Sequence, residues 1–317
     1  MSILFILIGL VAIGWGADRF TDGAGGLARR FRVPEIVIGL TIVGFGTSLP
    51  EFCVSFVAAL EGSSDIALGN VVGSNIFNAL LIVGCAAAVA PIVVERRTVM
   101  GDLPFSVVAC AMLAVMCADG RVTRLDALML VLVFVVYMLR ALRLAREGRG
   151  GEAIVTSAAP AAPLRSIWWC LGWLVGGMVC LVVGSRLFVS GATDVARSLG
   201  VSEAIVGLTI AAAGTSLPEL ATSVVAARKG QAGIALGNVI GSCVFNIFFV
   251  VGVTGLISPM AAEQITTLDF VVMFSSMLLV WGMSFTKYKI ERWEGFVLIF
   301  LFLAYITYLV LREMGVA

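Results

Sequence analysis

The sequence predicts an all-α integral membrane protein of ten transmembrane helices, arranged as two inverted repeats of five helices. Three observations lead to this fold class. About 60% of the 317 residues are apolar and 13% are charged, roughly half the charged fraction of ordinary soluble domains. Ten apolar segments are long enough to cross a bilayer. The second half of the chain also repeats the first.

A transmembrane helix needs roughly 20 mainly apolar residues. Segments of this kind lie near residues 3–27, 34–60, 65–90, 102–118, 124–144, 166–196, 201–228, 232–257, 267–285 and 292–312. The first segment lacks a basic leading region and a convincing cleavage site, so we interpret it as a retained helix rather than a signal peptide.

The longest polar stretch, residues 145–165, reads as a linker between a first repeat at 1–144 and a second at 166–317. Lysine and arginine are concentrated in alternate connections, and this linker is one of them. The positive-inside rule then places the linker in the cytoplasm. We therefore expect a multi-pass protein of the cell inner (plasma) membrane with both termini outside.

Two sequence motifs recur in the second half of the chain at a constant offset. EIVIGLTIVGFGTSLPE at 35–51 returns as EAIVGLTIAAAGTSLPE at 203–219, and IALGNVVGSNIFN at 66–78 returns as IALGNVIGSCVFN at 234–246. The offset is 168 positions each time, and 26 of the 45 residues from 34 to 78 are identical to their counterparts. Because five helices is an odd number, the second repeat would enter the membrane from the opposite side, as in many transporters.

The motif GTSLPE lies in the middle of the second and seventh apolar segments. Its proline removes a backbone donor and should break the helix. Backbone carbonyls freed at membrane depth are tolerated where they line a polar cavity, and such oxygens suit Na⁺ and Ca²⁺. The closing glutamates, Glu51 and Glu219, are costly in a membrane and so indicate a functional site.

Hydroxyl and amide side chains flank both glutamates. Thr47 and Ser48 precede Glu51 by four and three positions and share its helix face. In the next apolar segment Asn70, Ser74 and Asn78 are spaced by four. The counterparts in the second repeat are Thr215, Ser216, Asn238, Ser242 and Asn246. These side chains either line the site or join helices by hydrogen bonds, and for Asn70 and Asn238 both interpretations stay open.

With these paired motifs the sequence resembles the sodium/calcium exchanger family of the cation/calcium antiporter superfamily, in its prokaryotic form. The resemblance covers nearly the whole chain, and GTSLPE followed by GNxxGS in both halves is a specific signal. It implies a secondary transporter, not an enzyme, that exchanges Na⁺ for Ca²⁺ by alternating access, with electrogenic Ca²⁺ extrusion and no cofactor. The first and sixth helices would slide against the rest.

The resemblance also implies a set of ion ligands, in which Gly44 and Ala212 contribute backbone carbonyls. The set is Gly44, Thr47, Ser48, Glu51, Ser74, Asn78, Ala212, Thr215, Ser216, Glu219, Ser242 and Asn246. At position 246 the potassium-dependent relatives carry aspartate, whereas this chain has asparagine. The resemblance therefore points away from K⁺ co-transport.

Other functions were weighed against this one. A Ca²⁺/H⁺ antiporter on the same scaffold is the main alternative, and a channel is another. Histidine is absent, which excludes His-based catalysis, and no basic cluster is typical of nucleic-acid binding. The expected partners are the two ions and the lipid bilayer, with no obligatory protein partner evident.

Two further groups of residues have simpler interpretations. The seven cysteines show no metal-binding or disulfide spacing and are expected to be buried free thiols. The charges in the first and sixth segments are expected to snorkel or to form ion pairs, although they could also flank an access path. These charges are Asp18, Arg19, Asp22, Arg186 and Asp194.

The predicted orientation can be tested by cysteine labelling in a protein whose native cysteines have been replaced. Gly150→Cys, in the linker, should react with a membrane-impermeant thiol reagent only after cells are permeabilised, because the positive-inside rule places it in the cytoplasm. Ser2→Cys, near the N-terminus, should react in intact cells. Labelling of position 150 in intact cells would reverse the topology.

Overall fold

The computed structural model describes residues 1–147, 164–199 and 212–314, and this part of the chain is almost entirely helical. Eight helices in it are long and apolar enough to cross a membrane. They are α1 (Ser2–Phe31), Ser64–Val89, Thr98–Met116, α8 (Arg124–Glu147), α9 (Ile167–Ser198), Ala232–Ile257, α15 (Thr267–Phe285) and α16 (Arg292–Glu313). The predicted all-α membrane class is confirmed, and these helices lie within a few residues of the expected segments.

Three of these spans contain a stretch of wider π-helical winding. Ser64–Val89 consists of α5 (Ser64–Ile76), η2 (Phe77–Ile82) and α6 (Val83–Val89). Ala232–Ile257 consists of α13 (Ala232–Val244), η5 (Phe245–Val251) and α14 (Gly252–Ile257). Thr98–Met116 begins with η3 (Thr98–Asp102) and continues as α7 (Leu103–Met116).

A ninth candidate span is bent by 45° at a break. Its first part comprises α2 (Glu35–Ile38), η1 (Gly39–Val43) and α3 (Gly44–Thr47), and its second part is α4 (Leu49–Leu60). Of the expected segment 201–228, the structure describes α11 (Ala212–Gly214) and α12 (Leu217–Arg228). Residues 201–211 of that segment, and residues 148–163 of the expected linker, lie outside the described residues.

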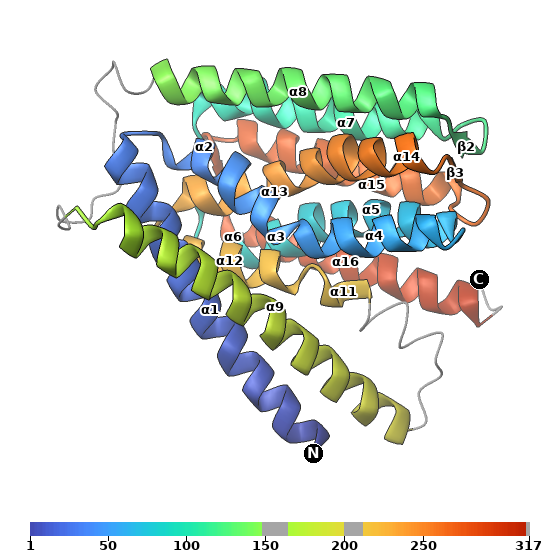
Figure 1. Cartoon of the computed structure of the whole chain (residues 1–317), viewed down its shortest axis with the longest axis horizontal. Helices are drawn as coiled ribbons and strands as arrows, with labels where there is room; N and C mark the ends of the chain where they lie inside the picture. The colour runs from blue at the N-terminus through green and yellow to red at the C-terminus, as the bar shows by residue number, and fades with distance from the viewer. Residues whose placement is uncertain (148–163, 200–211, 315–317) are drawn as a thin grey trace.

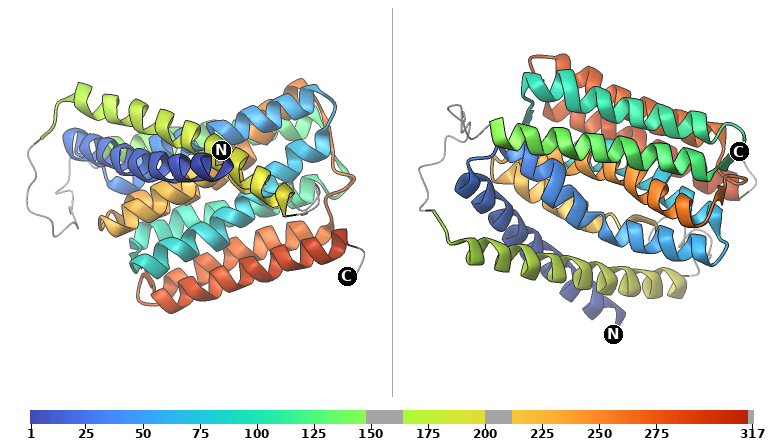
Figure 2. Two further views of the ribbon diagram at one scale, coloured as in Figure 1. Left: turned by 90° about the horizontal axis from the view of Figure 1, so that it is seen from below. Right: turned by 45° about the horizontal axis from the view of Figure 1, so that its top comes forward.

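Helices α1 and α9 form an antiparallel pair that runs obliquely to the stack of remaining helices (Figures 1 and 2). The pair is held close by glycines spaced seven residues apart. A Cβ added at Gly16 would lie 2.9 Å from the Gly177 carbonyl oxygen, and one added at Gly9 would lie 2.7 Å from the Gly184 carbonyl oxygen. Small residues at such positions let two backbones approach closely in a membrane, so α1 and α9 pack as one unit.

A second close approach joins the bent span to α13. A Cβ at Gly39 would lie 2.9 Å from the Gly237 Cα, and one at Gly44 would lie 3.0 Å from the Gly241 Cα. The first part of the bent span therefore lies directly against α13, although nearly 200 residues separate them in sequence. This contact brings the two GTSLPE and GNxxGS motifs into one region of the core.

Two short antiparallel strand pairs join connections of opposite halves. β1 (Ile92–Val93) pairs with β4 (Lys289–Ile290), and β2 (Arg121–Val122) pairs with β3 (Met260–Ala261). At the offset of 168 positions, the counterpart of β1 is β3 and the counterpart of β2 is β4. β1 thus pairs with the counterpart of β2, and β2 pairs with the counterpart of β1. Applying the repeat offset therefore converts one strand pair into the other.

The seven cysteines are free, as predicted, but the expectation that all are buried is wrong. Cys110, Cys117, Cys170 and Cys243 are buried, whereas Cys85 and Cys180 are half-buried and Cys53 is exposed. Cys53 follows Glu51 by two positions on α4, so it faces away from the glutamate's side of the helix. An apolar sequence context does not distinguish a lipid-facing thiol from a core thiol.

Packing of the α1–α9 pair predicts a difference between two glycines on one helix. Gly16→Leu should lower the melting temperature in detergent, because a Leu side chain would clash with the α9 backbone and overpacking costs about 1–3 kcal/mol or more. Gly14→Leu is the matched control, since a Cβ there meets no atom of the protein within 4 Å. Equal melting temperatures for the two variants would contradict this description of the interface.

Candidate ion-binding site

Both predicted helix breaks are present. Ser48 separates α3 from α4, and Pro50 is the second residue of α4, where its missing N–H is tolerated. Thr215 and Ser216 separate α11 from α12, where Pro218 has the same place. Glu51 and Glu219 therefore sit in the first turn of a new helix, where the partial positive charge of the helix N-terminus favours a carboxylate.

The breaks bring the two glutamates together through serines of the opposite half. Ser48 Oγ donates to Glu219 Oε1 at 3.2 Å, and Ser216 Oγ donates to Glu51 Oε1 at 2.9 Å. Both glutamates are 1% exposed. Each half of the chain thus completes the surroundings of the other half's carboxylate, and residues 168 positions apart in sequence converge on one site.

Neither carboxylate forms an ion pair within the part of the chain that the structure describes. The Oε2 atoms of Glu51 and Glu219 are buried and have no hydrogen-bond partner in the described part of the chain. None of the ion pairs found among the described residues involves either glutamate. A buried carboxylate without a counter-charge costs several kcal/mol, so this arrangement is suited to a bound cation.

On one side of the site the predicted ligands are in mutual contact. The Thr47 hydroxyl lies 3.1 Å from the Val43 carbonyl oxygen and 3.0 Å from Asn238 Oδ1. Ser242 Oγ lies 3.5 Å from the Thr47 hydroxyl and 3.4 Å from the Gly44 carbonyl oxygen. These residues come from the bent span and from α13, whose glycines bring the two backbones together.

Fewer contacts are described on the equivalent side in the other half, because residues 203–211, the counterpart of most of the first part of the bent span, lie outside the described residues. Thr215 Oγ1 is buried but finds no hydrogen-bond partner among the described residues. The Ser74 hydroxyl lies 3.3 Å from the Ser216 hydroxyl. Gly73 is exposed, whereas its counterpart Gly241 is buried. Ala212, the remaining predicted backbone ligand, is the first residue of α11.

The two predicted asparagine ligands lie in the π-helical stretches. Asn78 is in η2 and Asn246 is in η5, and both are buried. Asn78 Oδ1 and both amide atoms of Asn246 have no hydrogen-bond partner in the described residues. Unpartnered buried amides are unusual in folded proteins, and their oxygens match the hard ligands that Na⁺ and Ca²⁺ use.

Asn70 and Asn238 act differently from the predicted ligands. Their Nδ2 groups donate to the carbonyl oxygens of Glu51 and Glu219 at 3.2 Å. The same groups also donate to serine hydroxyls at 2.9 Å, Ser55 in the first half and Ser223 in the second. Both asparagines thus hold the backbone of a site glutamate, which supports the helix-joining interpretation.

Ser55 and Ser223 were missed by the sequence reasoning. Each follows its glutamate by four positions and is preserved at the repeat offset. That spacing places it on the glutamate's helix face, and this signal could have found both serines.

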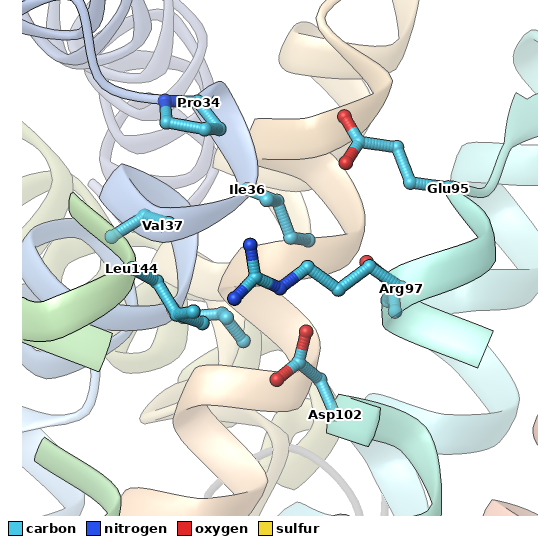
Figure 3. Close-up of a pocket in the computed structure, with 9 residues that line it drawn as sticks. Pro34, Ile36, Val37, Glu95, Arg97, Asp102 and Leu144 are labelled. Atoms are coloured by element: carbon cyan, nitrogen blue, oxygen red, sulfur yellow. The ribbon is translucent and has the colours of Figure 1, made fainter. Parts of the chain in front are cut away.

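A separate pocket lies near the start of the bent span and contains none of the predicted ligands (Figure 3). It is lined by Pro34, Ile36, Val37, Leu40, Glu95, Arg97, Thr98, Asp102 and Leu144. The Asp102 carboxylate also pairs with Arg140 at 3.6 Å, which ties η3 to α8. The two acidic groups in this pocket are accompanied by arginine, unlike those of the glutamate site.

Known membrane proteins are similar to this chain along both of its halves. The model of the sodium/calcium exchanger protein family matches residues 1–143 and 169–311. The sodium/calcium exchanger MaX1 of Methanosarcina acetivorans is 33% identical over 98% of both chains. The inner membrane protein YrbG of Escherichia coli K12 is 36% identical over 88% of this chain and 86% of its own.

A solved structure is similar in both sequence and fold. The sodium-calcium exchanger NCX_Mj, soaked with Na⁺ and Sr²⁺, superposes with a TM-score of 0.83 at 31% identity, covering 96% of this chain and 97% of that one. With paired buried glutamates at two helix breaks and a family match across both halves, this multi-pass membrane protein belongs to the sodium/calcium exchanger family of cation/calcium antiporters.

Proposed function

We propose that this protein is a secondary active antiporter that exchanges Na⁺ for Ca²⁺ by alternating access at the site between Glu51 and Glu219. The observation that carries the proposal is the pair of buried carboxylates, each bonded to a serine of the other half and neither in an ion pair with any described residue. A transported cation supplies the missing counter-charge. The protein acts as a transporter rather than an enzyme and needs no cofactor.

The ligands in this proposal are the two glutamates and the neutral oxygens around them. Ca²⁺ takes about six to eight oxygen ligands, and the proposed set exceeds what one ion needs, so it also accommodates Na⁺. The neutral members are Gly44, Thr47, Ser48, Ser74, Asn78, Ala212, Thr215, Ser216, Ser242 and Asn246. Their support is the contact of Ser48 and Ser216 with the glutamates and of Ser74 with Ser216. The unpartnered oxygens of Asn78, Thr215 and Asn246 also support them.

Counting charges gives the direction of transport. Two ionised glutamates neutralise one Ca²⁺, whereas about three Na⁺ on the same pair, the number implied by the family resemblance, leave a net positive charge. Exchange is then electrogenic, and each charge that moves across the membrane potential contributes about 2.3 kcal/mol per 100 mV. With an inside-negative potential and an inward Na⁺ gradient, Ca²⁺ extrusion is favoured.

The proposed architecture is ten transmembrane helices in two inverted repeats, at 1–144 and 166–317. The exchanged pairing of β1 with β4 and β2 with β3 supports it, because a two-fold axis in the membrane plane would relate the two pairs. We place the protein in the inner membrane with the 145–165 linker in the cytoplasm and both termini outside. The arginine-rich linker and the name of the Escherichia coli relative support this placement.

Ca²⁺/H⁺ exchange on the same scaffold is the competing function. Protons would need only the two carboxylates. The threonine, serine and asparagine oxygens around them favour coordination of a metal ion instead. Ca²⁺ uptake into proteoliposomes, with a Na⁺, K⁺ or pH gradient as the only driving force, separates these functions.

Glu51→Gln and Glu219→Gln should each reduce Na⁺-driven Ca²⁺ uptake in proteoliposomes to background. Each substitution removes one of the two negative charges of the site while keeping side-chain volume. Glu95→Gln is the matched control, since Glu95 is exposed and lies in the separate pocket. Wild-type uptake by either site variant, in protein with an unchanged elution profile, would refute the site.

Wild-type exchange should require Na⁺, proceed without K⁺ and carry net charge, because Asn246 adds an oxygen but no charge. Asn246→Asp should make transport sensitive to protons near neutral pH, since three clustered carboxylates cannot all stay ionised. Uptake is measured with and without K⁺ at several pH values. Strict K⁺ dependence of the wild type would contradict the ligand set, and uptake driven by a pH gradient without Na⁺ would favour the proton antiporter.

A further inference from the structure

A cluster of charges ties α1 to the turn after α12, away from the glutamate site. Lys229 Nζ lies 2.8 Å from Asp18 Oδ1 and 2.7 Å from Asp22 Oδ1, and it also donates to the Asp18 carbonyl oxygen at 2.8 Å. Arg19 completes the cluster at 3.8 Å from Asp18 and 3.6 Å from Asp22. The lysine belongs to the α12–α13 turn, so this cluster joins the α1–α9 pair to the helices that carry the site.

The repeat contains the same pair of positions with the charges exchanged. The counterpart of Asp18 at the offset of 168 is Arg186 on α9, and the counterpart of Lys229 is Glu61 in the turn after α4. Glu61 and Lys229 each end their helix and precede a glycine with positive φ, 79° at Gly62 and 72° at Gly230. The two turns therefore have the same backbone form but opposite charge.

Only one of the two equivalent pairs is formed. Asp18 and Lys229 are in contact, whereas Arg186 and Glu61 are both exposed and make no ion pair within 4.0 Å in the described part of the chain. Helix α1 packs extensively against α12. The α1–α9 pair thus rests against one turn while the charges for a contact with the other turn are present and unused.

The glutamate site is asymmetric in the same sense. Thr47 lies within hydrogen-bond distance of Asn238, but its counterpart Thr215 has an unpartnered hydroxyl in the described residues. Gly241 is buried against the bent span, whereas Gly73 is exposed. Among the described residues, the more closely packed site residues are therefore those on α13, and the turn that precedes α13 carries the closed ion pair.

We propose that Asp18–Lys229 and Arg186–Glu61 are two alternating latches, and that each closes in one access state of the transporter. This proposal rests on the alternating access of the proposed function. In an inverted-repeat transporter the second state is reached when the two halves exchange conformations. Under that exchange the contact of Asp18 with Lys229 becomes a contact of Arg186 with Glu61, made by the same glycine-packed α1–α9 unit.

The reversed charges make each of the two turns specific for one residue of the α1–α9 pair. Asp18 would repel Glu61, and Arg186 would repel Lys229, so a turn attracts only the helix residue that belongs to its state. The Lys229 side chain is 26% exposed and that of Asp18 is 41% exposed. An ion pair this accessible changes an equilibrium by a factor of a few, which stabilises an end state without stopping the cycle.

Paired cysteines in a protein without native cysteines test the latches in proteoliposomes. Asp18→Cys with Lys229→Cys should cross-link with a short bifunctional methanethiosulfonate, which forms reducible disulfides, in the state described here. Arg186→Cys with Glu61→Cys should cross-link only when the other state is visited, and therefore faster during ion exchange than without substrate ions. Each cross-link should stop Ca²⁺ uptake, and reduction should restore it.

The outcomes separate this proposal from the proposed function. If the parent protein without cysteines shows no Na⁺-driven Ca²⁺ uptake while its fold is retained, the proposed function fails. If the parent exchanges ions but Arg186→Cys with Glu61→Cys never cross-links, or cross-links equally fast with and without substrate ions, the latch proposal is overturned.

A neutralised lysine provides a second test, which compares cross-linking rates between variants. Adding Lys229→Gln to the Arg186→Cys, Glu61→Cys protein opens the first latch, so the cross-linking rate should rise about two- to fivefold. Lys289→Gln, which removes a surface pair with Glu291 at 3.2 Å, should leave the rate unchanged. An unchanged or lower rate with Lys229→Gln would contradict the proposal.

Discussion

The structure depends on the burial of two carboxylates that form no ion pair with any described residue. Glu51 and Glu219 are almost fully enclosed, and each accepts a hydrogen bond from a serine of the opposite half. Such groups destabilise a fold unless the surroundings favour negative charge. Helix N-termini and serine hydroxyls meet part of that requirement here, and under the proposed function a transported cation meets the rest. The site therefore depends on the helix breaks that form it.

Helix breaks alone would not bring the two halves together, and glycines make the approach possible. Gly39 and Gly44 pack against Gly237 and Gly241 at distances that leave no room for a side chain. The same device, repeated at seven-residue intervals, joins α1 to α9. Backbone contact of this kind keeps packed helices rigid, and motion is then expected between packed units rather than inside them.

The repeated sequence adopts two different environments in one molecule. Gly241 is buried and Gly73 is exposed, and Lys229 is paired while Glu61 has no ion pair in the described residues. Equivalent residues in unequal surroundings are what an alternating-access protein needs, because the second state can be built from contacts that the first already contains. The charge exchange between the two turns then makes the two states chemically distinct.

The sequence by itself determined the membrane class, most span boundaries, the two helix breaks and the two glutamates. These follow from local properties, namely apolar length, proline geometry and the cost of a charge in lipid. The repeat offset also indicated which residues are equivalent. Local pattern did not reveal that Cys53 is exposed or that Asn70 and Asn238 hold the glutamate backbones.

Only the tertiary structure decided which equivalent residues are in contact. Ser48 bonds to Glu219, and Lys229 to Asp18, across 171 and 211 positions. Such contacts form when glycine-lined helices from opposite halves pack together, and nothing in the local sequence of either partner encodes the distance between them. The repeat supplies two equivalent pairs of residues, and helix packing decides which of the two is in contact.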